Sequence, residues 1–205
     1  MRYIALLRGI NVGGAHKVEM KKLRELFLSL GYTDVSTYIN SGNVFFEATG
    51  KVPLLRKKIS DAIESTFGFP VPTLVKSRRE MQVIADAVPQ MWGNDTDQKT
   101  DVAYLFPEID TEKTMDDLPL NRDIVAIRYV PGALFWNVVR KSLGKSRLNK
   151  VAAHPLYRLM TVRNVNTCRY LGGMVHSRQA NTGAPPRPSR QRTQVMSYSS
   201  VYAHI

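Results

Sequence analysis

The sequence predicts an α+β protein that repeats a ferredoxin-like βαββαβ unit twice in tandem, with antiparallel sheets, helices on one face of each sheet and a disordered C-terminal tail. Two observations predict this. The order strand, helix, strand, strand, helix, strand occurs twice, although the halves share little residue identity. Gly172-Gly173 then precedes a segment rich in Ser, Thr, Gln, Pro and Arg. We place the first half at residues 1–77, a linker with a helix at 78–98, the second half at 99–173 and the tail at 174–205.

Apolar spacing defines the elements of the first half. A nearly continuous apolar run favours a buried strand, whereas the helical spacing after Met20 favours an amphipathic helix that stops at Gly31. The turn residues Asn40–Asn43 join two strands in a hairpin, and Pro53 suits the first turn of a second helix. Strands are predicted at Tyr3–Leu7, Val35–Ile39, Val44–Ala48 and Val71–Val75, and helices at Met20–Leu30 and Leu54–Phe67.

The same order returns in the second half, after a connecting helix near Arg79–Ala87. Asp110 is placed to cap a short helix, and Pro131-Gly132 turns a second hairpin. A basic stretch at about 139–155 is helical or irregular. Strands are predicted at Asp101–Phe106, Ile124–Tyr129, Leu134–Val138 and Tyr157–Val162, and helices at Thr111–Leu118 and Val165–Leu171.

The excess positive charge is confined to the C-terminal part of the chain. The formal net charge is +12, yet residues 1–123 hold 16 Lys and Arg against 17 Asp and Glu. The 82 residues from Ile124 to Ile205 hold 13 Lys and Arg and no acidic residue. This asymmetry indicates an anionic partner, either nucleic acid or a phosphorylated small molecule, with a solvated basic face as the alternative.

Cysteine usage and hydropathy suggest a cytoplasmic protein. A single cysteine, Cys168, excludes an internal disulfide and suits a reducing compartment. No stretch approaches the roughly 20 apolar residues of a membrane span, and Arg8 and Gly9 interrupt the first apolar run, so neither membrane association nor a signal peptide is expected. The four histidines are widely spaced and no metal-binding motif occurs, so no metal and no cofactor are predicted.

Three motifs carry a resemblance to a known family. They are LLRGINVGG at residues 6–14, YINSGNV at 38–44 and TVRNVNT at 161–167. Over about residues 1–171 the chain resembles a widespread, mainly bacterial family known as a domain of unknown function. The resemblance implies a tandem ferredoxin-like fold and no established activity. Val165 stands where the family often has an aromatic residue, and the chain after about Leu171 does not resemble the family.

The loop after the first strand is a candidate anion site. It is not a P-loop, because its lysine does not directly follow a glycine. Gly13-Gly14 nevertheless leave backbone N–H groups accessible before a helix, and Arg8 and Lys17 can add charge-assisted hydrogen bonds. Alternatively, the glycines only make the turn from strand to helix. Since the first and third strands of a βαββαβ unit are antiparallel neighbours, this loop should meet the Asn40–Asn43 turn.

Arg163 is the third element of the predicted site. A guanidinium beside amide side chains suits a carboxylate or a phosphate, although Asn164 or Asn166 can instead cap the following helix. The predicted ligand-binding residues are Arg8, Asn11, Gly13, Gly14, Lys17, Asn40, Ser41, Asn43, Arg163, Asn164 and Asn166. A basic stretch predicts contact with a nucleic-acid backbone through Arg140, Lys141, Lys145, Arg147 and Lys150, unless it is only an exposed basic helix.

These patterns favour a binding module for anionic ligands, either nucleic acid or phosphate-bearing molecules. One alternative is a small-molecule enzyme or sensor with a pocket between the glycine-rich loop and the Asn-Ser-Gly-Asn turn. Another is a structural or protein-interaction protein that pairs its sheet edges. No catalytic residue is identified, since the nucleophile motif G-x-S-x-G is missing from the sequence. The oligomeric state is left open.

Removing residues 174–205 should leave the melting temperature nearly unchanged. The segment holds four arginines, three prolines and no acid, so it offers little apolar surface to offset an ordering cost of roughly 1–2 kcal/mol per residue. Differential scanning calorimetry of the chain ending at Gly173 and of the full chain measures the effect. A drop of many degrees would show that the end of the chain packs on the core.

Overall fold

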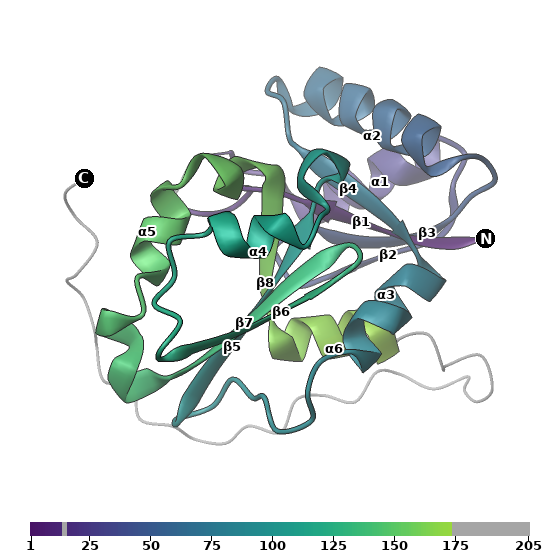
Figure 1. Ribbon diagram of the computed structural model, residues 1–205. Helices are drawn as coiled ribbons and strands as arrows, with labels where there is room; N and C mark the ends of the chain where they lie inside the picture. The colour runs from purple at the N-terminus through teal and green to yellow at the C-terminus, as the bar shows by residue number, and fades with distance from the viewer. Residues whose placement is uncertain (14–15, 174–205) are drawn as a thin grey trace, which may run out of the picture.

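The architecture consists of two four-stranded antiparallel sheets with helices, consistent with two repeated halves (Figure 1). The computed structural model describes residues 1–13 and 16–173. The predicted disordered tail at 174–205 lies outside the described residues.

The first half has the predicted element order. Its sheet has the strand order β2-β3-β1-β4, so β1 pairs with both β3 and β4. The central strand β1 is buried because it carries an almost continuous apolar run. The elements are β1 (Arg2–Leu7), α1 (Met20–Ser29), β2 (Thr33–Tyr38), β3 (Asn43–Glu47), α2 (Val52–Phe67) and β4 (Thr73–Ser77).

The second half repeats this strand order as β6-β7-β5-β8. The helix α3 (Arg78–Asp86) connects the halves and begins with a capping box between Ser77 and Glu80. The remaining strands and α-helices are β5 (Gln98–Leu105), α4 (Lys113–Asp117), β6 (Val125–Val130), β7 (Ala133–Val139), α5 (Leu148–Ala153), β8 (Met160–Asn164) and α6 (Val165–Gly173). Three 3-10 helices are η1 (Pro107–Ile109), η2 (Arg140–Lys145) and η3 (Pro155–Leu159).

Two local predictions for the second half were wrong. The last strand begins at Met160 rather than Tyr157, because Pro155 opens a 3-10 helix. Asp110 does not cap the short helix. Its carboxylate Oδ1 instead accepts hydrogen bonds from the backbone N–H of Gly132 at 2.7 Å and from the hydroxyl of Tyr129 at 3.1 Å. Asp110 therefore fixes the turn of the second hairpin, while the N-cap residue of α4 is Glu112, whose side chain makes no capping hydrogen bond.

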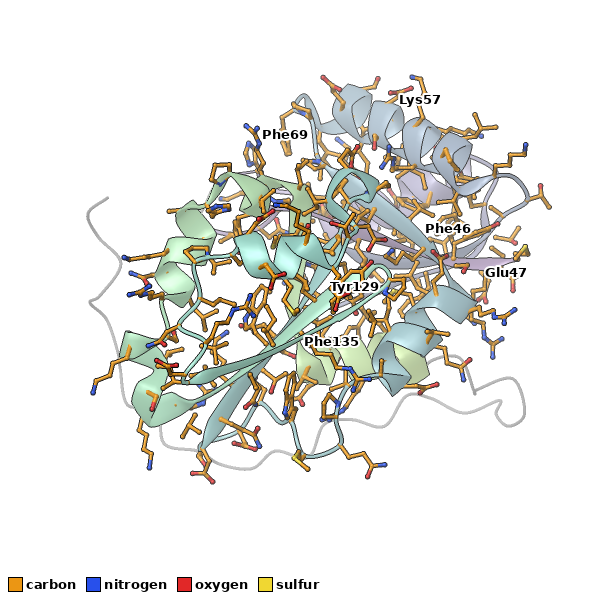
Figure 2. The ribbon with its side chains drawn as sticks, viewed as in Figure 1. Phe46, Glu47, Lys57, Phe69, Tyr129 and Phe135 are labelled. Carbon is orange, nitrogen blue, oxygen red and sulfur yellow. The ribbon has the colours of Figure 1, made fainter. Side chains whose placement is uncertain are left out.

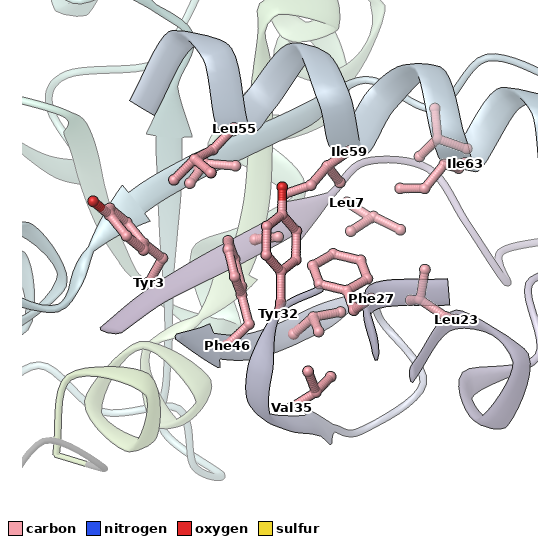
Figure 3. Close-up of a cluster of buried hydrophobic side chains, with 14 of the residues drawn as sticks. Tyr3, Leu7, Leu23, Phe27, Tyr32, Val35, Phe46, Leu55, Ile59 and Ile63 are labelled. Atoms are coloured by element: carbon pink, nitrogen blue, oxygen red, sulfur yellow. The ribbon is translucent and has the colours of Figure 1, made fainter. Parts of the chain in front are cut away.

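One face of the first sheet packs against its own helices. Leu55, Ile59 and Ile63 project from α2 toward the sheet, where they meet Tyr3 and Phe46 (Figure 3). These α2 residues recur at a spacing of four, which places them on one helix face. The opposite side of α2 is polar, and Lys57 points from it into solvent (Figure 2).

The other face of the first sheet turns toward the second sheet. The prediction placed helices on one face only, yet α3 and α6 lie side by side on the faces that the two sheets turn to each other (Figure 1). Gly172 of α6 allows this contact, because a Cβ atom at this position would lie 2.3 Å from the Cβ of Ala85. A central core thus joins the two halves, with Leu6, Tyr104 and Phe135 among its fully buried members.

Within residues 1–13 and 16–173, no helix is long and apolar enough to span a bilayer. The same residues contain no group of three His, Cys, Asp or Glu side chains that could hold a metal ion. The single cysteine, Cys168, is fully buried in α6, and burial raises the pKa of its thiol to about 11. Cys168 is therefore a protonated core residue at neutral pH.

Replacing Gly42 with alanine should lower the free energy of unfolding by about 3 kcal/mol. Gly42 has φ +74°, and an added Cβ would lie 2.7 Å from the Cβ of Leu7. Gly31→Ala is the control, since Gly31 has φ +85° but open space around it, and it should cost only about 1 kcal/mol. Urea denaturation measures both variants. Equal losses would show that the contact with Leu7 has no energetic role.

Candidate functional site

The guanidinium of Arg163 connects the two halves. It lies at the end of β8 on the face that turns toward the first sheet, and the residue is 8% exposed. Its five N–H groups donate five hydrogen bonds. The acceptors are Asn43 Oδ1 at 2.8 Å, Thr161 Oγ1 at 2.9 Å, and the backbone carbonyls of Val162 at 2.9 Å, Leu7 at 2.9 Å and Ser41 at 2.8 Å. Three of these acceptors belong to the first half, so Arg163 fixes β8 against the ends of β1 and β3.

The glycine-rich loop and the Asn-Ser-Gly-Asn turn meet at this point, as the strand order predicts. The backbone N–H of Leu7 donates to the carbonyl of Gly42 at 2.8 Å. The Asn11 amide Nδ2 donates to the carbonyl of Asn40 at 2.9 Å and also to the carbonyl of Val18. The three sequence motifs therefore form one hydrogen-bonded junction.

The asparagines of this junction hold the backbone in place. Asn11 has a left-handed φ of 57°, and its Oδ1 accepts a hydrogen bond from the N–H of Val18. Asn43 is fully buried, and its Nδ2 donates to the carbonyl of Tyr38 and to Ser41 Oγ, both at 3.0 Å. Asn11 therefore holds the loop against the turn, and Asn43 holds the turn through Nδ2 while its Oδ1 accepts from Arg163.

Arg163 brings a buried positive charge without a carboxylate partner. All five of its hydrogen-bond acceptors are neutral oxygens. Within the described residues, Arg163 forms no ion pair with an Asp or Glu side chain. Burial lowers the pKa of Arg163 to about 10, so the guanidinium stays charged at neutral pH. Its field therefore favours an anion nearby.

A cavity of about 290 Å³ opens beside this charge, between the glycine-rich loop and β8. Arg8 and Arg163 both line it, together with Ser41 and Tyr157. Arg8 is half-buried, and its Nε donates to the carbonyl of Met160 at 3.0 Å, while its guanidinium carbon lies 5.6 Å from the centroid of the Tyr157 ring. Among the described residues that line the cavity, none is acidic and none is a histidine.

Other predicted residues lie elsewhere. Asn11, Lys17 and Asn40 border a second cavity, of about 610 Å³, together with Glu19. Gly13 adopts φ +61° in the same loop, and Gly14 lies outside the described residues.

Asn164 and Asn166 are exposed and do not line the Arg8 cavity. Asn164 Oδ1 accepts a hydrogen bond from the N–H of Thr167 at 2.8 Å, so it caps α6, as the alternative interpretation predicts. Asn166 Nδ2 lies 3.5 Å from the carbonyl of Asn94.

The basic stretch forms η2 and α5. Arg140 is tied to the preceding loop through a hydrogen bond from Nη2 to Asn94 Oδ1 at 3.1 Å. All five predicted nucleic-acid contacts are exposed: Arg140, Lys141, Lys145, Arg147 and Lys150.

Tyr157 and Thr161 belong to the site, although the sequence analysis assigned them no role in it. Tyr157 sits in a 3-10 helix and lines the cavity beside Arg8, whereas Thr161 accepts a hydrogen bond from Arg163 two residues along the same strand. No local motif marks Tyr157. Its position depends on how the second half folds back onto the first.

The comparisons with known proteins agree with the motifs. The family described as "Protein of unknown function (DUF1697)" matches residues 1–135. Among solved structures, the conserved bacterial protein SP0830 from Streptococcus pneumoniae is similar, with 29% sequence identity and a TM-score of 0.74 over 85% of this chain and 98% of that chain. No curated protein matches the chain. The matched family residues include the first two motifs, and the third lies beyond them.

Replacing Arg163 with methionine should lower the free energy of unfolding by at least about 3 kcal/mol, because several buried acceptors would lose their donor. Arg158→Met is the control, since Arg158 is exposed on η3 and its loss should cost less than about 0.5 kcal/mol. Urea denaturation measures both. If the two variants were equally stable, Arg163 would not hold the halves together.

Proposed function

Because the chain belongs to the DUF1697 family, whose function is unknown, we propose a function from the geometry of its own residues: it binds a small phosphate-bearing molecule in the cavity lined by Arg8 and Arg163. The observation that supports this most directly is the unpaired charge of Arg163. A buried cation beside an open cavity with no acidic lining favours an anion there. We further infer that each half is a ferredoxin-like unit, which the strand orders β2-β3-β1-β4 and β6-β7-β5-β8 support.

The two arginines have different tasks in this proposal. Arg163 has all its N–H groups committed, so it contributes electrostatic attraction from the floor of the cavity. Among residues 1–13 and 16–173, the one hydrogen bond of the Arg8 side chain runs from Nε to the carbonyl of Met160. The two terminal nitrogens of Arg8 are available to donate hydrogen bonds to a phosphate. Two phosphate oxygens are spaced so that a planar guanidinium can bind both at once.

Binding is a better match to this cavity than catalysis. Its polar side chains are the two arginines, Ser41, Tyr157 and Thr161, and neither a histidine nor a carboxylate stands among the described lining residues. General acid–base chemistry most often uses those two groups. The lining therefore supports a sensor or carrier of a phosphorylated molecule.

Nucleic acid is a second candidate partner, which the exposed cations of η2 and α5 support. Backbone binding through Lys145, Arg147 and Lys150 would weaken steeply as salt concentration rises. A single-stranded oligonucleotide titrated at two salt concentrations distinguishes this partner from a phosphate held by Arg8.

Arg8→Gln should weaken the binding of ribose 5-phosphate by about ten- to a hundredfold, because a charge-assisted hydrogen bond is worth roughly 1.5–3 kcal/mol. Isothermal titration calorimetry at low salt measures this. Lys17→Gln is the matched control, since it removes the same charge from the neighbouring cavity with Asn11 and Asn40. Equal weakening in both variants would indicate general attraction by the basic surface and would contradict a site at Arg8.

A further inference from the structure

A larger cavity, of about 570 Å³, adjoins the proposed phosphate site. It lies over the outer face of the second sheet, beneath the segment formed by η2 and α5. Trp136 of β7 and Asp101 of β5 line it from the sheet, and Leu148 and Ala152 line it from α5. This volume lies within the range of roughly 300–1,000 Å³ that is usual for small-molecule sites.

The two cavities share part of their lining. Tyr157 and Val162 border both of them, and Arg8 lies against the ring of Tyr157. A ligand that fills the larger cavity therefore lies next to the side chains that line the cationic one. The two cavities are therefore neighbours, and we place one ligand across both.

The lining of the larger cavity suits a planar ring with N–H donors. The half-buried Tyr157 and Leu148 supply aromatic and apolar surface, and Trp136 and Val151 line the cavity as buried side chains. The polar side chains of this lining include Asn149 and the ion pair between Lys99 and the Asp101 carboxylate. Asp101 Oδ2 accepts from the Lys99 ammonium and from Trp136 Nε1 at 3.3 Å, which fixes the carboxylate next to the indole.

A carboxylate in such a cavity accepts hydrogen bonds from a donor, and the ion pair with Lys99 compensates its charge. Asp and Glu carboxylates accept hydrogen bonds from the exocyclic amino groups of nucleobases, and aromatic side chains stack on their rings. The anionic end of the same ligand is attracted to the guanidinium groups of Arg8 and Arg163, which line the smaller cavity. These two preferences place the ends of the ligand in opposite cavities.

We infer that the ligand is a nucleoside monophosphate whose base carries an amino group, with the base in the Trp136–Asp101 cavity and the phosphate beside Arg8. This assignment rests on the proposed function, because it uses Arg8 as the phosphate site. The new part of the inference is the chemical class of the ligand, in which the phosphate is attached to a nucleoside.

The experiment compares AMP and GMP with ribose 5-phosphate, which lacks the base, and with adenosine, which lacks the phosphate. Trp136 reports binding directly: the chain has two tryptophans, and Trp92→Phe leaves Trp136 as the single tryptophan, which can be excited selectively over tyrosine. Ala152→Phe fills the larger cavity from α5. Ala153→Phe is its matched control, since both alanines are exposed on the same helix and only Ala152 lines the cavity.

AMP and GMP should quench Trp136 and bind at least about tenfold more tightly than ribose 5-phosphate or adenosine. Ala152→Phe should reduce both nucleotides to the affinity of ribose 5-phosphate and leave ribose 5-phosphate unchanged, and Ala153→Phe should change nothing. If ribose 5-phosphate bound as tightly as AMP, or if Ala152→Phe had no effect, the proposed base site would be contradicted. The proposed phosphate site beside Arg8 would be unaffected by that result. If adenosine bound as tightly as AMP, or if no phosphate compound bound, the proposed function would fail and this assignment with it.

Discussion

The junction between the two halves depends on burying the Arg163 guanidinium. A buried guanidinium is stable only when each of its N–H groups finds an acceptor, since a charged donor without a partner carries a large desolvation cost. Three of the five acceptors come from residues 120 to 156 positions earlier in the chain. The side chain can therefore be satisfied only when both halves are folded and docked, which ties β8 to the ends of β1 and β3.

The same requirement explains the character of the candidate site. Every acceptor around Arg163 is neutral, so the junction satisfies its hydrogen bonds and leaves its charge uncompensated. The cavity beside it is bordered by a second guanidinium, that of Arg8, which Met160 and Tyr157 hold in place. Two positioned cations in a partly desolvated cavity attract an anion more strongly than the same charges do in open solvent.

The central core makes the two repeats one structural unit. Each sheet has one face covered by elements of its own half, and the other faces meet across α3 and α6. The contact between these helices requires the small residue Gly172 in α6 opposite Ala85 in α3. Because the halves share this core, their relative position is fixed, and a cavity between them keeps a defined shape.

The sequence by itself determined the strand order, the family and the meeting of the glycine-rich loop with the Asn-Ser-Gly-Asn turn. The strand order and the meeting of the two loops follow from apolar spacing and turn residues, which act over short stretches of chain, whereas the family follows from the resemblance that the three motifs carry. Only the tertiary structure decided the roles of individual side chains. Asp110, a good capping residue in isolation, instead holds the turn of the second hairpin. Arg163, which the sequence predicts as a ligand contact, is buried and links the two halves. Tyr157 and Trp136 border adjacent cavities although no local pattern pairs them, because which side chains line a cavity depends on how distant segments dock.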